Sequence, residues 1–129
     1  MKSILTIFTF VFTLMFSFTS FAEWVKIGGN TTTGFYVDYE RLRKHDGYFY
    51  IWSLTNYAKP ITEAKLLSSK KYYQVDCDLF RYKVLQYVYH KEPMGRDVGE
   101  PAEPHNKNWR YPEPKRFYEY FIKRVCDRS

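Results

Sequence analysis

The sequence contains little cysteine and histidine, with two and three residues respectively in a chain of 129. The histidines, His45, His90 and His105, fall in or beside separate turns and share no spacing with cysteine or carboxylate residues. Cys77 and Cys126 have no histidine neighbour at ligand spacing, and two thiolates alone do not make a structural zinc site. We therefore expect no metal and no cofactor.

Motifs of the common catalytic sites are also missing. No serine lies in a nucleophile-elbow sequence, and Gly28-Gly29 lacks the context of a phosphate-binding loop. Asp76 and Asp78 flank Cys77, and we interpret them as turn residues that end a strand rather than as an acid–base pair. These absences predict a binding protein and not an enzyme.

Long apolar runs are absent from the chain except at its N-terminus. Lys2 precedes an apolar stretch at residues 4–18, and Ser20-Phe21-Ala22 supplies the small residues of a cleavage site. The alternative is a membrane-spanning helix, which needs about 20 apolar residues, but threonine and serine interrupt this stretch. We therefore predict a signal peptide at residues 1–22.

Residues 23–129 have the size of one domain. No cysteine follows the apolar run and no later stretch is long enough to span a bilayer, so we expect neither a lipid anchor nor stable membrane insertion after signal cleavage. The exported domain would lie in the periplasm, at the cell surface or outside the cell.

Charge of one sign is in moderate excess. The chain carries a formal net charge of +6, and about +5 remains without Lys2. Such a balance favours anionic partners, including acidic glycans, lipid headgroups and acidic proteins. The basic residues are spread along the chain and an export signal directs it away from DNA, so we expect no nucleic-acid partner.

Alternating and β-prone segments predict a mainly β domain. Asp46-Gly47 predicts a hairpin turn, and Pro60 is expected to end the preceding strand because proline has no amide donor. Prolines gather in residues 93–114, which we predict to be irregular, with Trp109 as an anchor. The expected strands are residues 23–27, 35–42, 48–57, 72–77 and 79–90.

The C-terminal segment changes to a helical period. Apolar residues repeat at four-residue steps in residues 117–126, which predicts an amphipathic helix with Cys126 on its apolar stripe. Cys77 shares a strand face with Tyr73 and Val75. Because the chain is predicted to be exported, we predict a Cys77–Cys126 disulfide that clamps this helix to one face of the sheet. Closing a loop of this length is worth at most about 4 kcal/mol in the chain-entropy treatment.

Several segments in this order resemble the bacterial surface-adhesin protein E family, over essentially all of residues 23–129. The matching stretches are "EWVKIGG" with "GFYVDYERLRK", "YIWSLTNYAKP" with Trp52, "VDCDLFRYKVLQ" with Cys77, "EPMG", and the closing pattern from Trp109 to Cys126. The resemblance implies an α+β fold: a mostly antiparallel sheet of about six strands, with a C-terminal helix packed on one face and tied by the disulfide.

The resemblance also implies adhesion to host extracellular-matrix or serum proteins such as vitronectin and laminin, and it makes a homodimer plausible. Two features of this chain depart from the family pattern. The typical adhesin is a lipoprotein, whereas no lipid-attachment cysteine is present here. The Gly-Ser that usually precedes the closing helix is replaced by "PEPKR".

A basic, tyrosine-rich set on one predicted strand is the candidate partner-binding surface. Arg81, Lys83, Tyr87 and Tyr89 are expected along one outer face, where stacking and charge could hold a protein, peptide or glycan. The alternative interpretation is a solvated sheet face. Two functions stay open: an adhesin for host proteins, and a periplasmic accessory or inhibitor protein that binds a cell-envelope component.

Overall fold

The computed structural model describes residues 22–128. The predicted signal peptide, apart from Ala22, lies outside these described residues, so its cleavage stays a prediction. Among residues 22–128, no helix combines the length and the apolar character needed to cross a membrane.

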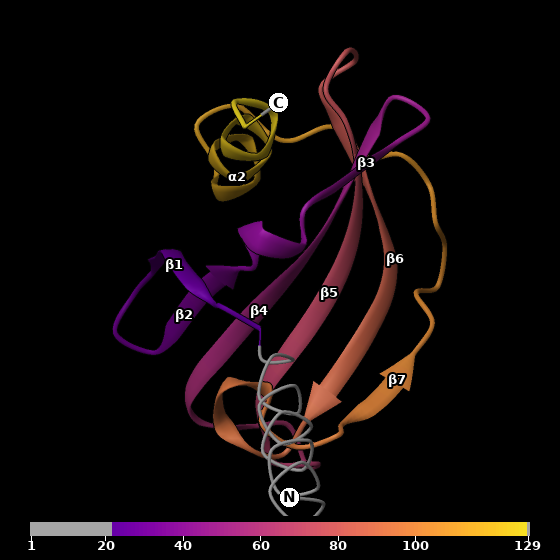
Figure 1. Cartoon of the computed structure of the whole chain (residues 1–129). Coiled ribbons are helices and arrows are strands. Elements are labelled where there is room, and N and C mark those ends of the chain that lie inside the picture. The colour runs from indigo at the N-terminus through magenta and orange to yellow at the C-terminus, as the bar shows by residue number, and fades with distance from the viewer. Residues whose placement is uncertain (1–21, 129) are drawn as a thin grey trace, which may run out of the picture.

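One antiparallel sheet forms most of the domain (Figure 1). Its strands follow the order β1-β2-β4-β5-β6-β7, and β3 pairs with the first residues of β4, Tyr48 to Tyr50. The predicted mostly antiparallel sheet is therefore confirmed. The strands are β1 (Val25–Gly29), β2 (Thr33–Val37), β3 (Arg43–His45), β4 (Tyr48–Ile61), β5 (Leu66–Asp76), β6 (Arg81–His90) and β7 (Glu100–Ala102).

Turn chemistry explains where the central strands begin. Asp46 and Gly47 join β3 to β4 with φ angles of 51° and 83°, as a two-residue turn with both angles positive requires. At the C-terminal end of β5, the carboxylate of Asp76 accepts hydrogen bonds from the amides of Asp78 and Leu79, at 3.2 and 3.3 Å. Asp76 thus closes the β5–β6 turn, as predicted.

Several strand boundaries differ from the sequence prediction. Strand β5 begins at Leu66 instead of residue 72, and β7 lies inside the segment predicted to be irregular. The segment expected to stay extended to residue 42 leaves β2 after Val37 and forms the 3-10 turn η1 (Tyr39–Arg41). Pro60 lies inside β4 instead of ending it. The β4–β5 ladder is interrupted between Asn56 and Ile61, so the missing amide donor of Pro60 breaks no ladder hydrogen bond.

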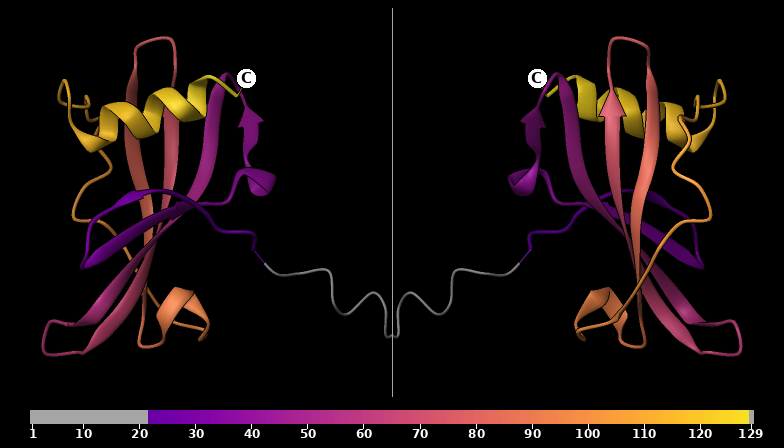
Figure 2. Two further views of the ribbon diagram at one scale, coloured as in Figure 1. Left: turned by 90° about the vertical axis from the view of Figure 1, so that its left-hand side faces the viewer. Right: turned by 90° about the vertical axis from the view of Figure 1, so that its right-hand side faces the viewer.

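The hydrophobic core is shared between the sheet and helix α2 (Phe117–Cys126). Phe121, Ile122 and Val125 of α2 are each at most 1% exposed. Figure 2 shows α2 running across the strands at the end of the sheet that carries the β5–β6 turn. The buried core cluster comprises Ile27, Val37, Phe49, Ile51, Tyr73, Val75, Tyr82, Val84, Phe121, Ile122 and Val125.

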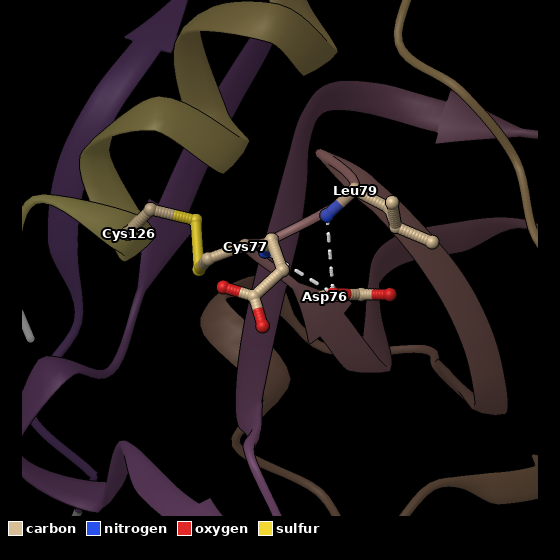
Figure 3. The surroundings of a disulfide bond; sticks show 5 residues. Asp76, Cys77, Leu79 and Cys126 are labelled. Carbon is tan, nitrogen blue, oxygen red and sulfur yellow. Dashed lines mark hydrogen bonds between the residues drawn. A yellow bond between two sulfur atoms is a disulfide. The ribbon is translucent and has the colours of Figure 1, made fainter.

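The predicted disulfide is present. Cys77 and Cys126 are bonded, with Cα atoms 5.7 Å apart and a sequence separation of 49 (Figure 3). The bond joins the residue after β5 to the last residue of α2. It therefore connects the C-terminal helix covalently to the middle of the chain.

The turn η2 (Pro93–Gly95) covers the sheet on the face opposite the core, at the end away from α2 (Figure 2). The amides of Met94 and Gly95 donate to the side chains of Asn56 and Ser68, both at 2.8 Å. The Ser68 hydroxyl donates in turn to the carbonyl of Glu92, at 2.6 Å. This cover explains why Leu54, which points away from the main core, is fully buried.

Candidate functional site

The two faces of the central sheet carry different side chains. Ile51, Tyr73 and Val84 lie opposite one another in β4, β5 and β6, and we call their side the core face. Tyr50 and Lys83 lie opposite Gln74 on the other side, which we call the outer face. Opposed residues in an antiparallel ladder share a face, so the register assigns every strand residue to one of the two faces.

A bulge in β6 divides the predicted binding surface between these two faces. Tyr72 opposes Gln86 and Tyr73 opposes Val84, which leaves Leu85 without a partner. An extra residue reverses the alternation of the strand beyond it. Strict alternation from Arg81 would place all four candidates together, and a bulge leaves no clear mark in the sequence.

Arg81 and Lys83 therefore lie on the outer face. Lys83 opposes Gln74 and Arg81 opposes Asp76. Tyr87 and Tyr89 oppose Lys71 and Ser69 and lie on the core face, beyond the buried cluster. The structure brings each pair together but places the two pairs on opposite sides of the sheet.

The outer-face pair meets Trp109, the predicted anchor of the proline-rich segment. The Arg81 guanidinium carbon and the Lys83 Nζ lie 4.2 and 4.4 Å from the centre of the Trp109 ring. Tyr48 contacts the same ring, with centroids 5.5 Å apart. The backbone of Arg110 pairs with Tyr82 through hydrogen bonds of 2.9 and 2.8 Å. These contacts fasten residues 109–110 to β6.

Arg81 also forms a stronger local contact. Its Nε donates to Asp76 Oδ2 at 2.9 Å. Burial alone would raise the pKa of Asp76, but this hydrogen bond and the amides of Leu79 and Asp78 outweigh it and lower the pKa. In the folded chain, the Arg81 side chain is thus held by Asp76 and by the ring of Trp109.

The core-face pair borders a cavity of about 470 Å³. The rings of Tyr87 and Tyr89 are nearly parallel, at 5°, with centroids 6.0 Å apart. Lys71 Nζ lies 5.7 Å from the centre of the Tyr87 ring. We call this space the tyrosine cavity; its lining is Tyr57, Ser69, Lys71, Tyr87, Tyr89, Glu103, Pro104, His105, Asn106 and Arg110.

A chain of hydroxyl groups connects this cavity to α2. Lys71 Nζ donates to the hydroxyl of Tyr118 at 3.5 Å, and that hydroxyl lies 3.3 Å from the hydroxyl of Tyr73. Burial, followed by the neighbouring Tyr118, raises the pKa of Tyr73 well above its ordinary value. Burial also raises the pKa of Tyr82 to about 12. These phenols stay protonated at neutral pH and serve as hydrogen-bonding groups.

A second cavity, of about 530 Å³, lies on the other side of the molecule near η2. Its lining includes Trp24, Arg41, Lys70, Met94 and Arg96. Burial lowers the pKa of Lys70, whose Nζ donates to the carbonyl of Gly95 at 3.4 Å. Its wall also includes Ala22, which adjoins residues that the structure does not describe.

No described residues form a metal site. Within residues 22–128, no group of three or more histidine, cysteine, aspartate or glutamate side chains could hold an ion. His45 pairs with its neighbour Asp46, and His105 lines the tyrosine cavity. His90 is the last residue of β6, beside a turn as the sequence indicated, but it is fully buried and contacts Asp97.

Comparison with solved structures finds the same fold in protein E of Haemophilus influenzae. Crystal form II of that protein matches with a TM-score of 0.61 at 14% identity, over 84% of this chain and 91% of the other. A further structure of it gives 0.62 over 84% and 87%. Protein E from non-typeable Haemophilus influenzae gives 0.52 at 14% identity, over 81% and 84%.

Comparison at the level of sequence gives two results. No curated protein matches the chain. The family described as surface-adhesin protein E matches residues 24–127, which is nearly all of the described part. The chain belongs to the surface-adhesin protein E family.

Proposed function

We propose that this protein is an exported, non-enzymatic adhesin that binds a host extracellular-matrix or serum protein, with vitronectin and laminin as the first candidates. The observation that carries the proposal is the family match over residues 24–127. The net charge of about +5 on residues 23–129 is consistent with an acidic partner.

The surface of the domain offers suitable contacts. Aromatic rings are enriched where proteins meet partners, because they combine apolar area with a polar tip. Tyr89, Tyr111 and Tyr120 are 37%, 64% and 46% exposed. The outer face adds Trp52 and Tyr72, whose ring centroids are 4.8 Å apart. Among these groups, we propose the tyrosine cavity and its rim as the principal partner-binding surface.

Binding to immobilised vitronectin and laminin tests the adhesin proposal. Disulfide-intact protein of residues 23–129 is expected to bind at least one of them saturably, and to keep part of its affinity at high salt. Charge attraction between exposed groups is screened by salt, whereas aromatic burial is not. The control is an unrelated basic protein of equal size and net charge. Binding that this control reproduces, or that salt abolishes, would contradict the proposal.

Location separates the adhesin from its rival. We propose that residues 1–22 are removed on export and that the domain reaches the cell surface. Protease added to intact cells is then expected to digest the protein. Complete protection from protease would instead favour the periplasmic accessory or inhibitor that binds an envelope component.

The homodimer stays a prediction. Strands β1 and β7 lie at the two ends of the main sheet order, and an exposed strand edge can pair with a second chain. We expect light scattering of the purified domain to give the mass of two chains. A monomer at every concentration would contradict the prediction without affecting the adhesin proposal.

A further inference from the structure

We propose that the tyrosine cavity binds an acidic sugar, meaning a pyranose ring that carries a carboxylate. This proposal goes beyond adhesion to a host protein and does not depend on it. It rests on three features of the cavity: its unpaired cations, its aromatic wall and its neutral polar groups.

The cavity carries positive charge that the protein does not neutralise. Lys71 and Arg110 both line it. Among residues 22–128, neither cation lies within ion-pair distance of a carboxylate. The one acidic residue of the lining, Glu103, is already paired with Lys107 at 2.9 Å. The site therefore favours an anion.

The chemical groups of the two cations, a guanidinium and an ammonium, favour a carboxylate as the anion. A guanidinium group matches the two oxygens of a carboxylate with two parallel hydrogen bonds, and such charge-assisted pairs are the strong ones. Arg110 is exposed, and its side chain, which hydrogen-bonds to the neutral Tyr82, keeps further N–H donors for a ligand. Lys71 is held in place by Tyr118 and by the ring of Tyr87, so it supplies a positioned positive charge in the wall of the cavity.

The aromatic wall favours a ring over a simple anion. The ring of Tyr89 is 37% exposed and stands nearly parallel to that of Tyr87. One face of a pyranose presents C–H groups that pack on an aromatic ring. A flexible acidic peptide would have to give up far more conformational freedom to fill the same space. The geometry thus supports a rigid sugar ring over a peptide.

Neutral polar groups complete the site. The hydroxyls of Tyr57 and Ser69 lie 3.1 Å apart at the wall and can both donate and accept hydrogen bonds. The side-chain carbonyl of Asn106 accepts from the amide of Asn108 at 3.1 Å, which leaves its amino group for a ligand. A volume of about 470 Å³ falls in the range of about 300–1,000 Å³ typical of small-molecule sites.

The test is an NMR titration of the disulfide-intact domain of residues 23–129 with glucuronic acid and N-acetylneuraminic acid. Glucose, an uncharged sugar, and a short glutamate peptide are titrated separately as comparison ligands. We expect at least one acidic sugar to shift amide signals of β5, β6 and residues 103–106, and to bind at least about tenfold more tightly than glucose, as one charge-assisted hydrogen bond would give.

Matched variants locate the binding. Lys71→Met is expected to weaken acidic-sugar binding about tenfold, while Lys83→Met, on the outer face of the same sheet, leaves it unchanged. Tyr89→Ala is expected to weaken it about fivefold, and Tyr120→Ala, on α2, serves as its control. Amide spectra of the free variants show whether each is folded. If Lys71→Met fails to fold, Lys71→Arg is expected to retain binding and Arg110→Gln to lose it.

Several results would overturn the proposal. These are absence of any acidic-sugar binding, equal affinity for glucose, tighter binding of the glutamate peptide, or shifts confined to the outer face. If the protein binds vitronectin or laminin but no acidic sugar, the sugar-site proposal is wrong and the adhesin proposal stands. The reverse result would remove the adhesin proposal and leave the sugar site standing.

Discussion

At the scale of single residues, His90 is the side chain most sensitive to its surroundings. It is fully buried, and its Nδ1 lies 3.0 Å from the Asp97 carboxylate, to which it donates. Within residues 22–128, its buried Nε2 has no hydrogen-bond partner. Burial, followed by the positive charge of Lys70, lowers the pKa of His90 despite the nearby Asp97. The folded protein therefore holds this imidazole neutral.

This arrangement predicts a loss of stability in mild acid. Histidine in the unfolded chain takes up a proton below about pH 6.5, whereas the folded chain resists protonation until a lower pH. The unfolded state then binds more protons, so the free energy of unfolding falls as the pH decreases below that value. Hydrogen bonds from the Lys91 amide and from His90 lower the pKa of Asp97 against the effect of burial, which adds a second loss below about pH 4.

Urea denaturation at pH 7.5 and at pH 5 measures this effect. His90→Gln is expected to lower the free energy of unfolding by about 1–3 kcal/mol at pH 7.5. It is also expected to remove the histidine contribution to the fall in that free energy between pH 7.5 and pH 5. His45→Gln, at an exposed position, is expected to leave both unchanged. An equal pH dependence in the His90→Gln variant and the parent would contradict the prediction.

At the scale of elements, the disulfide has the clearest consequence. Helix α2 has ten residues, and isolated helices shorter than about 12–15 residues are marginal in water. Its stability therefore comes from its buried side chains and from the Cys77–Cys126 bond.

Removing the bond with Cys77→Ala and Cys126→Ala is expected to lower the free energy of unfolding by at most about 4 kcal/mol. Hydrogen exchange should show the loss of protection first in α2, while the amides of β4 and β5 change less. Reduction of the parent protein is the matched control and should give the same pattern. Uniform loss of protection, or none in α2, would contradict this view of the helix.

At the scale of the whole molecule, one core connects every large element. The buried cluster takes residues from β1, β2, β4, β5, β6 and α2, and the ring of Phe121 lies 5.0 Å from that of Tyr73. A chain with a single core of this size is expected to unfold in one cooperative step. Loss of a central side chain should therefore destabilise the whole domain rather than one element.

Phe121→Ala is expected to cost about 3–5 kcal/mol, a large part of the 5–15 kcal/mol that stabilises an ordinary domain. Far- and near-ultraviolet circular dichroism should still report one coincident transition at a lower denaturant midpoint. Tyr120→Ala, which alters the exposed side of the same helix, should shift the midpoint little. Separate transitions for the two signals would show that α2 and the sheet unfold independently.

Local sequence patterns were sufficient to predict the central parts of β1, β2, β4, β5 and β6, helix α2 and the disulfide, but not the short strands β3 and β7. Each depends on local information: alternation around Tyr73 and Val75, the four-residue period of the last segment, and a cysteine count that allows only one intramolecular pair. The arrangement of the site depends on tertiary contacts. Pairing with β5 sets the register of β6, and the unpaired Leu85 moves Tyr87 and Tyr89 to the face opposite Lys83. The cavity also needs residues 103–110 returning to β6, a long-range contact that no local pattern encodes.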